Sequence, residues 1–300
     1  MNALIAPAAL LLFGIVWGTT IPLGKIAVST GYHPLGLIFW QVVIVALALL
    51  PFIIGRRIWP RVDGIALRHY LAIAILGTIL PNSISYFVAA RLPAGILSIV
   101  ISTVPMFSTA IAVGIGSERF SLRRIGGIAL GLCAVLLLTA PGASLPDPAL
   151  AIFVLIGLLP PLMYAFEGNY VASFAPRNID PIASLFGASV LSALIAAPLA
   201  MVSGGFVDPI RAWQAPEWAL IFSSLGHVVA YTGYIWLLGV AGAVFTSQIS
   251  YIVTFSGVAT SAILLSEQYS WTVWLALLLM LAGMALVRPK RSKLSAVAGA

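Results

Sequence analysis

The feature that most constrains this chain is an internal repeat. Residues 101–138 form a long apolar run that contains Ser and Thr, then a turn with a glutamate, then a second apolar run with small residues. Residues 250–287 repeat this order, and a shift of 149 residues places Glu118 on Glu267. Two copies of one unit in 300 residues predict a fold built from two related halves.

The repeat extends beyond these two segments. Pro34 and Pro51 are 17 residues apart, and so are Pro181 and Pro198. We therefore expect a first unit at 1–142, a second at 143–290 and a basic tail at 291–300.

Composition places the repeat in a membrane. The chain is 61% hydrophobic and 8% charged, whereas about a quarter of the residues of a soluble domain are charged. Segments of about 17–25 apolar residues can cross a bilayer as helices, which satisfy their own backbone groups. We expect ten such helices: Leu4–Ala27, Pro34–Ile54, Tyr70–Ala89, Ala94–Gly116, Arg123–Ala140, Ala149–Tyr170, Pro181–Val202, Glu217–Leu238, Ala243–Leu265 and Trp271–Val287.

The distribution of Lys and Arg predicts the orientation. If the N-terminus is cytoplasmic, the inner segments carry 12 of these residues and the outer loops carry 2. Positive residues favour the cytoplasmic side, so both termini are predicted to be cytoplasmic, in a plasma (inner) membrane. Five helices per unit is an odd number, so the second unit would be inverted relative to the first. Inverted repeats are typical of secondary transporters.

Several sequence elements resemble the EamA-type drug/metabolite transporters. They are Trp17-Gly18, the run from Ser98 to Pro105, the turn at Glu118 and the pair Gly126-Gly127. The resemblance covers about 10–287 as two tandem units, with Thr254 in place of an expected proline and Gln268 in place of a basic residue. It implies a ten-helix exporter with a cavity lined by the third, fourth, eighth and ninth helices. Amino-acid exporters of the YddG kind are the nearest match.

Polar residues recur at helical spacing on the same four helices. The stripes contain Thr78, Asn82, Ser85 and Tyr86; Ser98, Ser102, Pro105 and Thr109; Ser223, His227, Tyr231 and Tyr234; and Ser247, Ser250, Thr254 and Ser261. Such stripes favour a polar cavity, but Ser and Thr in membrane helices also bond their own backbone or a neighbouring helix. The predicted substrate-binding residues are Trp17, Thr78, Asn82, Tyr86, Ser98, Ser102, Tyr164, His227, Tyr231, Tyr234, Ser250, Tyr251 and Thr254.

Few ionisable groups lie deep in the predicted spans. Glu167 and His227 are the candidates for proton coupling, because an ionisable group inside a membrane is a functional candidate by default. Each also has a simpler interpretation: Glu167 as a solvated carboxylate, and His227 as a neutral imidazole hydrogen-bonded to a neighbour. This scarcity favours facilitated diffusion over proton antiport. Lys25 is predicted to extend toward the interface, and Cys133 to be a small buried thiol.

The sequence predicts a transporter, not an enzyme. It contains no HExxH, G-x-S-x-G or P-loop motif, and we expect no metal or cofactor. The net charge of +7 lies in loops and the tail and indicates membrane topology, not nucleic-acid binding. We expect export of small amphipathic metabolites, foremost neutral and aromatic amino acids. The protein is expected to be a monomer or weak homodimer. Its helices are expected to bend at Pro105, Gly226 and Gly257. A multidrug or nucleobase exporter of the same fold, or a membrane scaffold or lipid-modifying enzyme, is the alternative.

Overall fold

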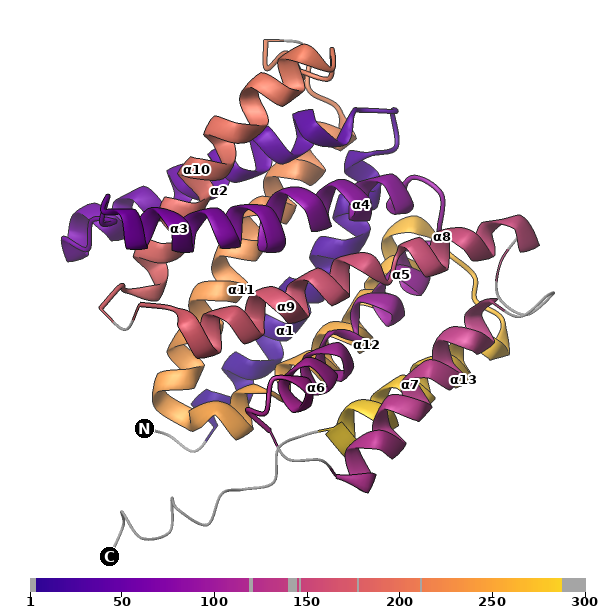
Figure 1. Cartoon of the computed structure of the whole chain (residues 1–300). Coiled ribbons are helices and arrows are strands. Elements are labelled where there is room, and N and C mark those ends of the chain that lie inside the picture. The colour runs from indigo at the N-terminus through magenta and orange to yellow at the C-terminus, as the bar shows by residue number, and fades with distance from the viewer. Residues whose placement is uncertain are drawn as a thin grey trace, which may run out of the picture.

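The computed structural model describes residues 4–118, 121–139, 145, 147–176, 178–210 and 212–287, and every regular element in these ranges is helical (Figure 1). In chain order the elements up to residue 139 are α1 (Ile5–Ala27), α2 (Pro34–Arg56), α3 (Gly64–Ala72), the π-helix η1 (Ile73–Ile79), α4 (Leu80–Ala89), α5 (Ala94–Ile101), α6 (Val104–Gly114) and α7 (Leu122–Thr139). After them come the 3₁₀ turn η2 (Pro148–Leu150), α8 (Ala151–Ile156), α9 (Leu159–Phe174), α10 (Pro181–Val202), α11 (Ala215–Thr246), α12 (Ile249–Leu265) and α13 (Trp271–Val287).

The described residues contain eight helical stretches that are long and apolar enough to cross a membrane. Three of them are composite: 64–89 joins α3, η1 and α4; 94–114 joins α5 and α6; and 148–174 joins η2, α8 and α9. The remaining apolar helices, α12 and α13, have 17 residues each. A helix of 17 residues spans about 26 Å, at the lower limit for a membrane crossing. The all-helical membrane architecture is therefore confirmed.

The predicted boundaries differ from the structure by more than two residues at four helices. The third stretch begins at Gly64 rather than Tyr70, and the sixth continues to Phe174 instead of ending at Tyr170. The helix predicted for Glu217–Leu238 runs on to Gly242, where φ is 78° and the helical conformation breaks. A further short helical segment then precedes α12, which begins at Ile249 rather than Ala243. The predicted unit boundary at 142 and the tail 291–300 lie outside the described residues.

Helix starts follow a polar residue before a proline or glycine. Asp180 Oδ1 accepts the backbone N–H groups of Ile182 and Ala183 at 2.8 and 3.4 Å, and the next residue, Pro181, has no N–H to satisfy. Asp63 caps α3 in the same way. Capping satisfies the exposed donors at a helix start, so these short polar motifs fix where the spans begin.

Prolines interrupt the three composite stretches. A proline cannot bond the carbonyl four residues earlier and clashes with it. For Pro105 that carbonyl belongs to Ile101, the last residue of α5, and for Pro160 it belongs to Ile156, the last residue of α8. For Pro81 it belongs to Gly77, which lies within the π-helix η1. Pro105, a predicted bend position, therefore follows the break between α5 and α6.

The two other predicted bend positions, Gly226 and Gly257, lie inside regular helices in this conformation. Gly226 lies inside the regular part of α11, where an added Cβ would be 3.1 Å from the Thr20 side chain. Gly257 lies inside α12 and packs against Ser98, with only 2.5 Å between the Ser98 oxygen and an added Cβ. Both glycines permit close helix packing, as small residues do between membrane helices.

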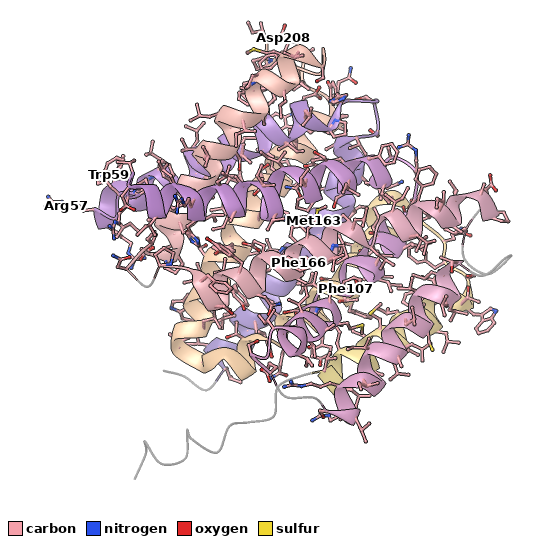
Figure 2. All side chains as sticks on the ribbon, viewed as in Figure 1. Arg57, Trp59, Phe107, Met163, Phe166 and Asp208 are labelled. Atoms are coloured by element: carbon pink, nitrogen blue, oxygen red, sulfur yellow. The ribbon has the colours of Figure 1, made fainter. Side chains whose placement is uncertain are left out.

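The helices form three groups in space. Helix α2 packs against α10 on one side, and α7 packs against α13 on the other (Figure 1). Between these pairs, α1 packs against α11 and α12, while α9 packs against α4 and α6. Elements from the two halves of the chain thus alternate in the interior. Figure 2 shows α9 beside α6, marked by Met163, Phe166 and Phe107, with Arg57 and Asp208 at the periphery.

Close backbone contact holds the α7–α13 pair together. A Cβ added at Gly127 would lie 2.6 Å from the carbonyl oxygen of Gly283, so only glycine fits there. Cys133 lies on the exposed part of α7, so the prediction of a buried thiol is wrong. Apolar periodicity could not distinguish a lipid-facing position from a protein-facing one, because both require an apolar residue.

Candidate functional site

Tyrosines and amides from three helices meet in the interior. The Tyr164 hydroxyl on α9 donates to Asn82 Oδ1 on α4 at 3.0 Å. One turn along α4, the Tyr86 hydroxyl donates to Gln41 Oε1 on α2 at 2.7 Å. Tyr86 is 8% exposed and Gln41 is 9% exposed. The Tyr164–Asn82 bond joins predicted residues from both halves of the chain. Gln41 was missed because it is a single polar residue in an apolar span.

Glu167 lies on α9 one turn after Tyr164. Its carboxyl group lies against Gly77 of η1, where an added Cβ would be 3.2 Å from the carboxyl carbon. Tyr164 and Tyr231 of α11 are both close enough to interact electrostatically with Glu167. Thr78 is the neighbour of Gly77 in the same π-helix. Because π-helical turns often occur at functional sites, this junction of η1, α9 and α11 is a candidate binding region.

The contact between α5–α6 and α12 contains a chain of hydroxyl groups. Ser102 Oγ and Thr254 Oγ1 are 2.5 Å apart. Ser98, Ser102 and Thr254 each also donate to the carbonyl oxygen four residues earlier, at 3.0, 2.7 and 2.7 Å. Ser98, Ser102 and Thr254 are buried. At these three positions the geometry therefore matches the packing alternative, in which hydroxyl groups join two membrane helices.

The remaining predicted residues lie around α11 and α1. His227 Nδ1 lies 3.1 Å from the carbonyl oxygen of Ser223 in the same helix. Trp17 of α1 contacts Tyr234 of α11 edge-on, with 6.1 Å between ring centroids. These residues are partly buried, so the helix interface of α1 and α11 brings aromatic and imidazole groups together.

A cavity of about 460 Å³ lies beside this region, among α6, α9, α12 and α13. Its lining includes Ser108 and Asn169, and Asn169 Nδ2 donates to Ser108 Oγ at 3.0 Å. Two of the predicted binding residues, Ser250 and Tyr251, also line it. Glu118 lies at the rim, where its 41% exposed side chain pairs with Arg124 at 2.8 Å. We call this end of the molecule the Glu118 end.

The opposite end, which we call the Glu267 end, is held by polar contacts between the two halves. Glu267 Oε1 accepts the backbone N–H of Ala94 at 2.8 Å, and Oε2 accepts that of Gly95 at 3.1 Å. The Tyr269 hydroxyl also donates to Glu267. Burial raises the pKa of Tyr269 above its ordinary value of 10.0, so the hydroxyl remains a donor at neutral pH. The carboxylate thereby satisfies the first turn of α5.

Lys25 adds a second contact at the Glu267 end. Its ammonium group donates to the carbonyl oxygens of Ala89 and Leu92 at 2.9 and 2.6 Å, where α4 ends. The prediction that Lys25 extends to the interface therefore missed its role, because sequence alone does not show which carbonyls lie within reach. Tyr32 donates to Glu217 at the same end and joins the first loop to α11.

The described residues contain no group of three or more His, Cys, Asp or Glu side chains that could hold a metal ion. The interior is instead made of hydroxyl, amide, aromatic and single carboxylate groups. Such a set can bind a small polar or amphipathic solute.

These features define a polytopic helical membrane protein with polar groups from both halves in its interior. The EamA-like transporter family matches residues 4–140 and again 151–288, so the chain belongs to this family and is a transporter, not an enzyme.

Relatives and a solved structure agree with this assignment. The chain is 25% identical over 280 residues to the uncharacterized inner membrane transporter YedA of Escherichia coli K12, covering 90% of this chain and 86% of the relative. The YedA proteins of the O6:H1 and O157:H7 strains match equally. A crystal structure of a protein with 16% sequence identity superimposes with a TM-score of 0.62 over 98% of this chain and 99% of its own. This last similarity concerns the fold alone.

Proposed function

We propose that this transporter exports small amphipathic metabolites, foremost neutral and aromatic amino acids, from the cytoplasm by alternating access. The observation that carries the proposal is the meeting of Asn82, Tyr86, Tyr164, Glu167 and Tyr231 from both halves in a membrane interior. Flat solutes with a polar end suit a site made of aromatic rings and a few placed polar groups.

The alternating-access proposal rests on an inverted repeat. The family match falls twice on the chain, at 4–140 and 151–288. The contacts also support two interleaved halves. Helix α1 of the first half packs on α11 and α12 of the second, and α9 of the second half packs on α4 and α6 of the first. Two inverted units that rock against each other expose a shared interior to either side of the membrane.

The difference between the two ends of the molecule supports a conformation that is closed at the Glu267 end and open at the Glu118 end. The Glu267 end is held by the contacts of Glu267 and Lys25, whereas the cavity lies at the Glu118 end. The Lys and Arg count assigns the Glu118 end to the cytoplasm. The relatives are inner membrane transporters by name, and we propose the same membrane for this chain.

The repeat also suggests how the Glu118 end closes. The 149-residue shift that relates Glu267 to Glu118 relates Ala94 and Gly95 to Ala243 and Val244. Gly242, where the helical conformation breaks, occupies the position of Pro93, the residue before α5. In the alternate conformation we expect Glu118 to leave Arg124 and accept the N–H groups of Ala243 and Val244.

Counterflow in liposomes tests the transport proposal. Vesicles with the purified protein are loaded with unlabelled phenylalanine, and the uptake of labelled phenylalanine is followed. Saturable uptake above that of empty vesicles is expected. Counterflow of uracil without that of phenylalanine would favour the nucleobase exporter.

The same vesicles test coupling. We propose facilitated diffusion, because proton antiport needs ionisable groups inside the membrane and the sequence offers few. Glu167 and His227 are the two candidates that it identified in the described spans. Equal rates with and without an imposed proton gradient are expected. Uphill export that follows the imposed proton gradient would show proton antiport instead, and its loss in His227→Ala would identify that residue as the proton carrier.

A further inference from the structure

The position of Glu167 within α9 is deeper than the sequence suggested. Helix α9 continues to Phe174, seven residues beyond Glu167, rather than ending at Tyr170. At 1.5 Å per residue, the carboxylate is about 10 Å from the helix end. Its side chain is half-buried. The distance is too large for a glutamate to reach water simply by extending along the helix.

The opposing helix makes room for this carboxylate. At Gly77 an added Cβ would lie 3.2 Å from the Glu167 carboxyl carbon and 3.3 Å from Oε1, closer than about nine in ten Cβ contacts in proteins. Gly77 also supplies the carbonyl that Pro81 cannot bond. Glycine and proline together therefore shape η1 around the acidic group.

Charge compensation for Glu167 is missing in the structure. Among the described residues, no hydrogen bond or ion pair reaches its carboxylate. The basic side chain within a nearby span, Lys25, is bound to carbonyl oxygens at the Glu267 end. An unpaired carboxylate in a low-dielectric interior is costly, and a cation from a ligand would offset that cost.

The neighbours of Glu167 suit a cation with an apolar body. Tyr164 lies one turn before Glu167 on α9, and Tyr231 of α11 is within electrostatic range of the same carboxyl group. Aromatic faces attract ammonium groups, and aromatic rings also bury apolar surface. An anionic solute would be repelled by Glu167, and among the described residues no ion pair places a basic side chain beside it.

We propose that Glu167 binds the ammonium group of the transported solute, so that the substrates are amines or amino acids and not acids without an amino group. Tyr164 and Tyr231 contact the apolar part of the same solute. This inference rests on the proposed function, since it assigns the charge of the substrate for that site.

Three probes of similar shape test the assignment by titration calorimetry of the purified protein. They are 2-phenylethylamine, a cation; phenylalanine, a zwitterion; and 3-phenylpropionate, an anion. The first two are expected to bind and the third to bind at least roughly ten-fold more weakly, because hydrogen bonds to charged groups contribute about 1.5–3 kcal/mol.

Variants distinguish binding from folding. Glu167→Gln keeps the shape of the side chain and removes its charge, and it is expected to lose roughly ten-fold or more in affinity for 2-phenylethylamine. Asp208→Asn removes an exposed carboxylate in the α10–α11 loop and should bind as the parent protein does. Both variants should elute as single species with the melting temperature of the parent.

Two outcomes would overturn the inference. One is equal binding of the amine and 3-phenylpropionate, or an unchanged affinity in Glu167→Gln. The other is no binding of either amino compound while labelled uracil shows counterflow, which would retain a transporter but give it a different substrate. Absence of counterflow for every solute would count against the proposed function itself.

Discussion

The carboxylate of Glu267 caps the first turn of α5, with Oε1 2.8 Å from the backbone nitrogen of Ala94. These residues are 173 positions apart, and the bond joins the two halves of the chain at one end of the molecule. Removal of this cap should loosen that end without changing any membrane span.

We predict that Glu267→Ala opens the Glu267 end more often. Loss of a helix cap costs about 0.5–2 kcal/mol, and 1 kcal/mol corresponds to about a five-fold change in the open fraction. The measurement is the labelling rate of Leu92→Cys, a buried residue between α4 and α5, by a thiol reagent. Exposed Cys133 is first replaced by Ser.

The matched control is Glu118→Ala in the same background. Its carboxylate lies at the cavity end, so labelling of Leu92→Cys should not increase. Equal increases in both variants would show general loosening and not a local cap.

The buried bond between Tyr86 and Gln41 should contribute to stability. Tyr86→Phe keeps the ring and leaves Gln41 Oε1 without its donor, at an expected cost of about 1–3 kcal/mol. Tyr86→Phe with Gln41→Leu should recover part of this loss, since both polar partners are removed. Thermal unfolding in detergent of the parent, both single variants and the double variant gives the coupling. Strict additivity would contradict the bond.

The contact between Gly127 and Gly283 predicts opposite results at adjacent positions. Gly127→Ala should destabilise the protein by about 1–3 kcal/mol, because its methyl group would lie 2.6 Å from the Gly283 carbonyl oxygen. Gly126→Ala should be neutral or slightly stabilising, because the nearest atom is 3.9 Å away and alanine favours a helix. The melting temperatures of the two variants in detergent check this. Similar melting temperatures would contradict the packing of α7 on α13.

Asp63 predicts a pH dependence outside the membrane spans. The backbone N–H of Ala66, followed by Arg61 and the N–H of Ile65, lowers the pKa of this carboxylate below its ordinary value of 3.8. A lowered folded-state pKa gives stability that is present above the unfolded pKa and is lost as the pH falls through the folded one. The parent protein should therefore lose more stability than Asp63→Asn below about pH 4, since Asn caps the helix without titrating. Melting temperatures between pH 3 and 6 test this, and parallel curves would contradict it.

The topology prediction is independent of the site. A reporter fused after Ala300 and another inserted between Arg57 and Asp63 should both report a cytoplasmic location, because inner segments carry most Lys and Arg residues. A periplasmic signal from either fusion would contradict the charge count and, with it, the assignment of the Glu118 end to the cytoplasm.

In the interior, the sequence predicted which positions are polar but not which residues contact them. Helical spacing identified Asn82, Tyr86 and Tyr231 as polar positions, but it could not identify their partners. Gln41 and Gly77 complete the contacts of Tyr86 and Glu167, yet a single glutamine or glycine in an apolar span carries no periodic signal. The structure was also needed to show that Ser102 bonds Thr254 across two helices.

The amino-acid sequence alone predicts a helical membrane protein with two related segments. Apolar length, the low charge and the 149-residue repeat are local or periodic properties, so they can be read without coordinates. The coordinates were needed to identify which residues meet: Glu267 with Ala94, Tyr164 with Asn82, and Glu167 with Gly77. Lipid accepts any apolar surface, so an apolar pattern does not specify which helix faces pack together, and only the packed structure does.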